Sequence, residues 1–206
     1  MIALGPSANL PPHIWLEPFV SRVSLTLAIV LLALAGCDRA APDPAQGEGA
    51  LGAEKASLAG EVDRSRAGEL MPAETVRLPD GTQLNLGALQ GQPVLLNLWA
   101  TWCAPCKKEM PLLDELALER DGELRVLTVS QDLQGAEKVL PYFEQAGFQA
   151  LEPWLDPHNG LGQHYDAGLP MTVLYDANGQ EVWRIAGDYD WSSAEAAGLI
   201  DEGIGT

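Results

Sequence analysis

Apolar and polar positions in the second half of the chain follow the spacings of short strands and helices. Residues 76–78 and 83–86 alternate on either side of Pro79-Asp80-Gly81, which predicts two strands joined by a turn. Val94–Trp99 is a nearly continuous apolar run, typical of a strand buried on both faces. The pattern therefore predicts a small hairpin followed by a buried strand.

The segments that follow continue the alternation. Leucines recur at helical spacing after Cys106, and Asn178-Gly179 favours the positive φ angles of a tight hairpin turn. In order, the chain predicts a helix that opens near Cys106, a strand at 124–130, a helix at 133–146, a hairpin of Met171–Tyr175 and 180–185, and a last helix after Ser192-Ser193. Strands that alternate with helices indicate an α/β fold with helices packed on a central sheet.

The N-terminal part has the pattern of an export signal. Arg22 precedes the uncharged run 23–34, and small residues follow up to Cys37. This arrangement predicts a secretory signal peptide at residues 1–36. The apolar run is shorter than the about 20 residues that a transmembrane helix needs. Residues 1–19 contain four prolines and neither Lys nor Arg, which favours the hypothesis that the true start lies near Val20.

Leu34-Ala35-Gly36-Cys37 resembles the lipobox of bacterial lipoproteins. The resemblance implies cleavage before Cys37 and lipid attachment to it, and several acyl chains would anchor the protein stably. An incidental cysteine at the end of an uncleaved anchor helix is the alternative. Asp38 resembles the enterobacterial signal for retention at the inner membrane. Residues 37–69 contain few large apolar residues, so they predict a flexible, lipid-attached linker before a domain at 70–206.

Composition limits the classes of partner. The formal net charge of −17 opposes nucleic-acid binding, because phosphate contacts need clustered Lys and Arg. A hydrophobic content of 47% is ordinary for a chain that buries a core. The three cysteines, Cys37, Cys103 and Cys106, are too few for a disulfide framework.

Cys103-Ala104-Pro105-Cys106 follows the buried strand and opens the predicted helix. The first sulfur then lies at the helix N-terminus, where unpaired N–H groups and the positive end of the dipole favour its thiolate. A thiolate is the nucleophile of thiol–disulfide exchange, and the second sulfur lies one turn along. The pattern predicts a redox-active disulfide that needs no other cofactor. Half of a zinc site is the alternative, although the sequence has no second C-x-x-C.

Residues 97–111 resemble the thioredoxin superfamily, and more closely its TlpA/ResA-like branch of exported, membrane-tethered thiol–disulfide oxidoreductases. Gly168-Leu169-Pro170-Met171-Thr172 resembles the family's loop with a cis-proline beside the dithiol. The resemblance covers about residues 70–190. It implies a thioredoxin-like fold with a central mixed sheet flanked by helices, an N-terminal β-hairpin extension and a central insertion between Cys106 and Pro170.

The resemblance also implies roles for single residues. Cys103 would be the attacking nucleophile and Cys106 the resolving thiol. Other residues would bind the substrate or tune the reduction potential: Trp102, Leu169 and Pro170 for binding, and Ala104 and Pro105 for tuning. Glu109 matches an acidic residue of this branch that assists proton transfer, whereas Asn97 stands where thioredoxins have a buried Asp.

These roles imply an enzyme that reduces disulfides of specific exported proteins, and cytochrome c maturation is one role of the family because haem attachment requires reduced cysteines. We expect a monomer at the periplasmic face of the bacterial inner membrane that receives electrons from a membrane donor. Two alternatives stay open: an oxidant that donates disulfides, and a copper-binding or copper-delivery module in which His158 and His164 join the cysteines. The preferred hypothesis requires no metal.

Overall fold

The computed structural model describes residues 60–166 and 168–205. Within these residues an eight-stranded sheet has the strand order β1-β8-β7-β4-β5-β6-β2-β3. The strands are β1 (Val62–Asp63), β2 (Thr75–Arg77), β3 (Gln83–Asn85), β4 (Val94–Trp99), β5 (Arg125–Ser130), β6 (Trp154–Leu155), β7 (Met171–Tyr175) and β8 (Glu181–Ala186). The helices are α1 (Ala104–Glu119), α2 (Ala136–Ala146), α3 (Gly160–Tyr165) and α4 (Ala194–Ile204), and a 3-10 helix spans Leu86–Ala88.

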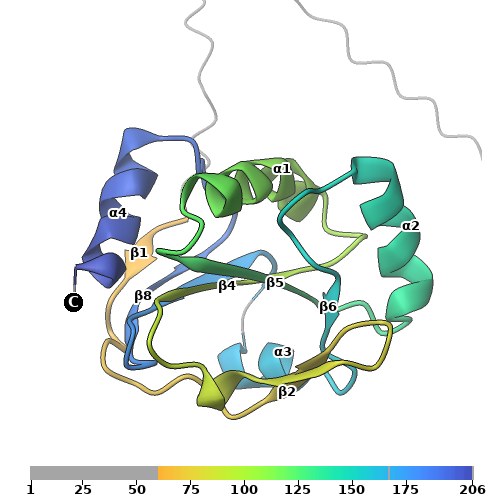
Figure 1. Ribbon diagram of the computed structural model, residues 1–206, viewed down its shortest axis with the longest axis horizontal. Helices are drawn as coiled ribbons and strands as arrows, with labels where there is room; N and C mark the ends of the chain where they lie inside the picture. Colours follow the sequence, from red (N-terminus) through yellow and green to blue (C-terminus); the bar gives the residue numbers. More distant parts are fainter. Residues whose placement is uncertain (1–59, 167, 206) are drawn as a thin grey trace, which may run out of the picture. The chain divides into compact units, whose positions relative to one another are not determined.

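The sheet is mixed. β4 pairs parallel with β5 and antiparallel with β7, and β5 pairs parallel with β6. Parallel strands need a long crossover connection, and α1 provides the one between β4 and β5 (Figure 1). The start of α1 therefore lies at the edge of the sheet where β4 and β5 end.

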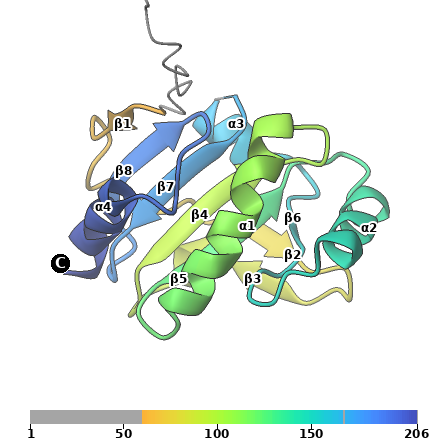
Figure 2. The same ribbon diagram turned by 90° about the horizontal axis from the view of Figure 1, so that it is seen from above.

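Helices cover both faces of the sheet. α1, α2 and α4 lie on one face, and α3 lies on the other (Figures 1 and 2). Alternate residues of β4 point to opposite faces, as in any strand. Leu95 and Trp99 join the apolar cluster under α1, whereas Leu96 and Leu98 join the cluster on the face of α3. All six residues of β4 are buried, which confirms the strand predicted from the continuous apolar run.

Most predicted elements are confirmed, including the N-terminal hairpin, which is β2–β3. The second helix begins at Ala136 rather than at residue 133, because Gly135 has φ 52° and ψ −129°, outside the helical region. Leu133 therefore lies in the loop before α2, and its side chain is 90% exposed. Between Cys106 and Pro170, where the central insertion was predicted, lie β6 and α3, which the sequence did not indicate because they are too short to leave a periodic pattern.

The folded part begins before residue 70, where the predicted linker ends. β1 pairs with β8 through Val62 opposite Ile185, and Leu70 forms a bridge with Gln180. The prediction was wrong for residues 60–69, because backbone pairing holds this segment although it contains few large apolar side chains. The predicted signal peptide at 1–36, the predicted lipidation site Cys37 and the predicted linker up to residue 59 lie outside the described residues.

Among the described helices, none has both the length and the apolar character needed to cross a bilayer.

Candidate redox-active site

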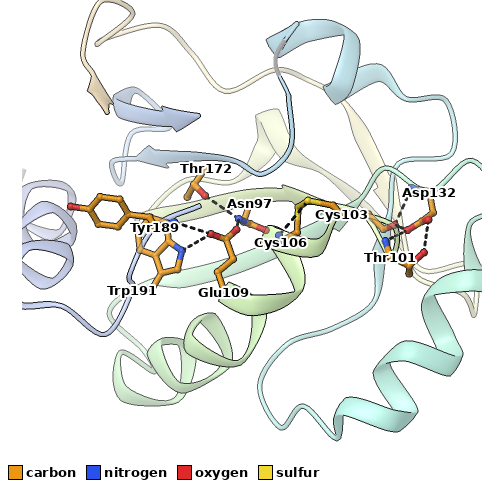
Figure 3. Close-up of a disulfide and its surroundings, with 10 residues drawn as sticks. Asn97, Thr101, Cys103, Cys106, Glu109, Asp132, Thr172, Tyr189 and Trp191 are labelled. Atoms are coloured by element: carbon orange, nitrogen blue, oxygen red, sulfur yellow. Dashed lines mark hydrogen bonds between the residues drawn. A yellow bond between two sulfur atoms is a disulfide. The ribbon is translucent and has the colours of Figure 1, made fainter. Parts of the chain in front are cut away.

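Cys103 and Cys106 form a disulfide at the N-terminus of α1 (Figure 3). Cys103 is the N-cap residue, its Sγ atom accepts the backbone N–H of Cys106 at 3.3 Å, and the two Cα atoms are 5.3 Å apart. Ala104 and Pro105 form the start of the helix, where the missing N–H of proline costs no hydrogen bond. Cys103 is 5% exposed and Cys106 is fully buried, so Cys103 is the more accessible of the two cysteines.

The sheet brings the predicted cis-proline loop, residues 168–172, to the edge where the dithiol lies. Met171 of β7 pairs with Leu98 of β4, and the Leu169–Pro170 peptide bond directly before β7 is cis. Trp102 is 70% exposed and lines one pocket together with Leu169, while Pro170 is buried. The structure therefore places the predicted substrate-binding residues at the edge of the sheet that also carries the dithiol.

Glu109 of α1 is buried behind the disulfide, with 2% of its surface exposed. Its Oε1 atom accepts a hydrogen bond from Nδ2 of Asn97 at 2.7 Å. Its Oε2 atom accepts the backbone N–H of Tyr189 and the indole N–H of Trp191, both at 3.3 Å. Nδ2 of Asn97 also donates to Oγ1 of Thr172 at 2.9 Å. Figure 3 shows that this network joins β4, α1, β7 and the segment after β8.

Burial raises the pKa of Glu109 from 4.5 to about 7. Desolvation is the largest cause, whereas the hydrogen bonds from Asn97, Tyr189 and Trp191 lower the pKa, and the charge of Asp188 raises it slightly. A carboxyl group with a pKa near neutrality can both take up and release a proton at physiological pH. The arrangement therefore provides a buried proton-exchanging group beside the dithiol.

Asn97 is suited to both protonation states of Glu109. Its Oδ1 atom has no hydrogen-bond partner among the described residues, although the side chain is fully buried. A half-turn of the side-chain amide would present Oδ1 to a protonated carboxyl, because the amide carries both donors and an acceptor.

An aspartate that was not identified from the sequence holds the loop before the dithiol. The carboxylate of Asp132, which follows β5, accepts the backbone N–H of Thr101 at 2.8 Å and its O–H at 2.7 Å. It also accepts the O–H of Ser130 at 2.8 Å (Figure 3 shows the bonds to Thr101). These bonds fix the residue two positions before Cys103. One signal was available in the sequence, because polar residues at the carboxyl ends of parallel strands meet at one edge of a sheet.

The histidines of the copper alternative lie near α3. His158 precedes this helix and His164 belongs to it, where its ring packs edge-on against Tyr165. Across residues 60–166 and 168–205, no group of three or more His, Cys, Asp or Glu side chains is arranged to hold a metal ion.

Comparison with known proteins finds thiol-disulfide oxidoreductases among the relatives of this chain. The chain is 30% identical over 129 residues to the thiol-disulfide oxidoreductase ResA of Bacillus cereus, covering 62% of this chain and 74% of ResA. It is 34% identical over 100 residues to the thiol:disulfide interchange protein DsbE of Escherichia coli, covering 48% of this chain and about half, 52%, of DsbE. A solved structure from Chlorobium tepidum, assigned as a DsbE, superimposes with a TM-score of 0.60 at 20% identity, over 67% of this chain and 97% of that one.

The fold and the site define a thiol–disulfide oxidoreductase with a thioredoxin-like α/β domain. The model of the Redoxin family matches residues 66–200, well over half of the sequence. The chain therefore belongs to the Redoxin family.

Proposed function

We propose that the protein reduces disulfides of specific extracytoplasmic proteins through Cys103 and Cys106. One observation supports this proposal above the others: in the cysteine pair at the N-terminus of α1 the first member is the more exposed of the two and the second is fully buried, and a carboxyl with a pKa of about 7 lies behind them. Such a pair can exchange two electrons with another dithiol, so the redox group is the protein's own disulfide.

Reduction of a client would take two displacement steps. The Cys103 thiolate attacks one sulfur of the client disulfide, a mixed disulfide forms, and the other client sulfur leaves as a thiolate that takes up a proton. The Cys106 thiolate then attacks Sγ of Cys103, which closes the protein's disulfide and releases the second client thiol. Two electrons pass from the protein to the client, and the client gains two protons.

We assign to Glu109 the handling of the Cys106 proton. Cys106 is fully buried, so its thiol needs an internal group to accept the proton before it can attack. Residues three apart on a helix are neighbours on its surface, which places Glu109 on the same side of α1 as Cys106. Asn97 cannot titrate, and it would follow the proton by turning its amide.

Residues around the dithiol would complete the site. Trp102, Leu169 and Pro170 would contact an extended segment of the client, because they lie at the same sheet edge as the cysteines. Ala104 and Pro105, which lie between the cysteines, would tune the reduction potential.

We place the enzyme at the periplasmic face of the bacterial inner membrane. A lipid on Cys37 would hold it there, and a membrane electron carrier would reduce its disulfide after each cycle. The lipobox-like residues 34–37 and the apolar run before them support this placement. Cytochrome c precursors are our proposed clients, because haem attachment requires reduced cysteines.

Trapping of the mixed disulfide tests the proposal. With the full chain, Cys106→Ser should accumulate a mixed disulfide with insulin, whereas Cys103→Ser should form none. The wild-type chain should release insulin thiols in the presence of dithiothreitol. Non-reducing electrophoresis and intact mass give the readout. Full exchange activity in Cys103→Ser would show that the nucleophile is assigned wrongly.

A further inference from the structure

Three polar side chains form a row under α1, one on each of three neighbouring strands. Asn97 of β4 is in register with Thr172 of β7 on one side and with Thr128 of β5 on the other. All three lie on the sheet face that α1 covers, because their chain neighbours join the apolar cluster of the opposite face. Thr128 is 1% exposed and the other two are fully buried, so bulk water does not reach this polar row.

The polar row contains two buried atoms without partners. Oγ1 of Thr128 and Oδ1 of Asn97 have no hydrogen-bond partner among the described residues. In contrast, Nδ2 of Asn97 donates to Glu109 at 2.7 Å and to Thr172 at 2.9 Å (Figure 3). Because the nitrogen is turned toward Thr172, the Thr128 side of the row is left for the oxygen. A hydroxyl can donate to such an oxygen, and this bond would satisfy both atoms.

A half-turn of the Asn97 amide would exchange its partners. When Glu109 is protonated, its O–H needs an acceptor, and Oδ1 of Asn97 can face it only after the amide has turned. The NH₂ group then faces Thr128, whose Oγ1 atom can accept, and the O–H of Thr172 can donate to Oδ1. A hydroxyl both donates and accepts, so the two threonines suit either orientation of the amide. A valine of the same shape would suit neither.

We propose that Thr128 is a positioning residue for Glu109: its hydroxyl pairs with Oδ1 of Asn97 when the carboxyl is ionised and with Nδ2 when the carboxyl is protonated. Thr128 acts through Asn97 and not on the reacting sulfurs. The inference rests on the proposed function, in which Glu109 handles the Cys106 proton. It lets that proton come and go without leaving a polar atom of the row unpaired.

Titration of the oxidised full chain tests this inference. The pKa of Glu109 is measured from the ¹³C resonance of its carboxyl carbon, which Glu109→Gln assigns. Wild type is compared with Thr128→Val, which removes the hydroxyl, and with Thr128→Ser, which keeps it. Thr75→Val is the control, because Thr75 is exposed on β2.

The comparison keeps the charges around Glu109 constant. Lys108 of α1 and Asp188 and Tyr189 of the segment after β8 line one small cavity with Glu109. Cys106 does not titrate while it is in the disulfide. The strands of the polar row add only uncharged groups, so a shifted pKa would report the missing hydroxyl.

Thr128→Val should lower the pKa of Glu109. The turned amide would leave a buried N–H without an acceptor, which proteins tolerate less well than an unpaired carbonyl oxygen, so the protonated form of Glu109 loses more than the ionised form. From the wild-type value of about 7, the pKa should fall by about 0.5–1 unit. Thr128→Ser and Thr75→Val should keep the wild-type value. An unchanged or raised pKa in Thr128→Val would overturn the inference.

A second measurement needs only the wild-type chain. The strongest nuclear Overhauser contacts of the Asn97 NH₂ protons should be with Thr172 above the pKa of Glu109 and with Thr128 below it. The same contacts at both pH values would overturn the inference. The proposed function fails separately: if the rate at which Cys106 resolves a mixed disulfide had the same pH dependence in Glu109→Gln as in wild type, the proton role of Glu109 would be wrong, whatever the titration showed.

Discussion

At the scale of single residues, the buried carboxyl of Glu109 depends on hydrogen-bond donors from distant parts of the sequence. The sequence marked this residue through a family resemblance, but it gave no sign of Tyr189 and Trp191, which lie 80 and 82 positions away. These two donors reach the carboxyl only because the segment after β8 returns to α1. Contacts of this length depend on the complete fold, and no local pattern encodes them.

The raised pKa of Glu109 predicts a pH-dependent stability. The folded state holds the proton up to about pH 7, whereas an unfolded carboxyl loses it near 4.5. The contribution of Glu109 to the free energy of unfolding is therefore fully present below pH 4.5 and is lost as the pH rises to about 7, by up to about 3 kcal/mol. Denaturant unfolding of the oxidised chain between pH 4 and 8 should show that the stability difference between wild type and Glu109→Gln changes over this window.

Glu115→Gln provides the control, because Glu115 lies exposed on the same helix. Its stability difference from wild type should stay flat over the same window. A flat difference for Glu109→Gln as well would contradict the buried, proton-exchanging carboxyl. In wild type, the rate at which Cys106 resolves a mixed disulfide should change near pH 7. In Glu109→Gln this change should be absent.

Asp132 predicts a second effect of a single residue. Asp132→Asn replaces one carboxylate oxygen by an NH₂ group that faces the donors of Thr101 and Ser130, so the free energy of unfolding should fall by about 1–3 kcal/mol. Thr101→Val removes only the O–H bond and should cost less, about 0.5–1.5 kcal/mol. Urea unfolding measures both variants. A smaller loss for Asp132→Asn than for Thr101→Val would show that the carboxylate does not hold the loop.

At the scale of elements, α4 packs against β7 through a glycine. Gly203 is buried, and a Cβ there would lie 2.6 Å from Cδ2 and 2.9 Å from Cγ of Leu174. The close approach also lets the carbonyl of Leu199 accept the indole N–H of Trp183 at 3.0 Å. The last helix is therefore a structural cover for the sheet, on the same face as the dithiol helix.

Two alanine substitutions in α4 should have opposite effects. Gly203→Ala should lower the free energy of unfolding by about 1–3 kcal/mol, because the methyl group must displace Leu174. Gly198→Ala should raise it by about 0.5–1 kcal/mol, because that position is exposed, has no atom within 4 Å of an added Cβ, and alanine has the higher helix propensity. Thermal or denaturant unfolding compares them, and a stabilising Gly203→Ala would contradict the packing described.

Elements with an apolar run or a turn motif were predictable from the sequence, and short elements without either were not. β4 and the β7–β8 hairpin have strong apolar runs and turn residues, which explains why they were placed correctly. β1 and β6 contain two residues each and depend on backbone pairing with distant strands, so no periodicity indicates them. Because Gly135 is not helical, α2 begins at Ala136 and not at residue 133 as predicted. Residues 133–135 therefore form a loop, which leaves Leu133 exposed beside the dithiol.

At the scale of the whole molecule, the sheet topology assembles the site. The parallel pair β4–β5 ends at the edge where α1 begins, and the antiparallel partner β7 starts there. Cys103, Asp132 and Pro170 therefore lie at the same edge of the sheet although they are far apart in the sequence. The C-x-x-C and the cis-proline were predictable from their motifs, whereas the supporting contacts depend on how the strands are ordered.

The reduction potential of the Cys103–Cys106 couple tests the account most directly, and it is measured by equilibrating the full chain with defined dithiothreitol and glutathione buffers. A reducing enzyme should have a potential near the about −270 mV of thioredoxin. A potential near the about −120 mV of a strong disulfide donor would contradict the proposed direction of electron flow and favour an oxidant instead.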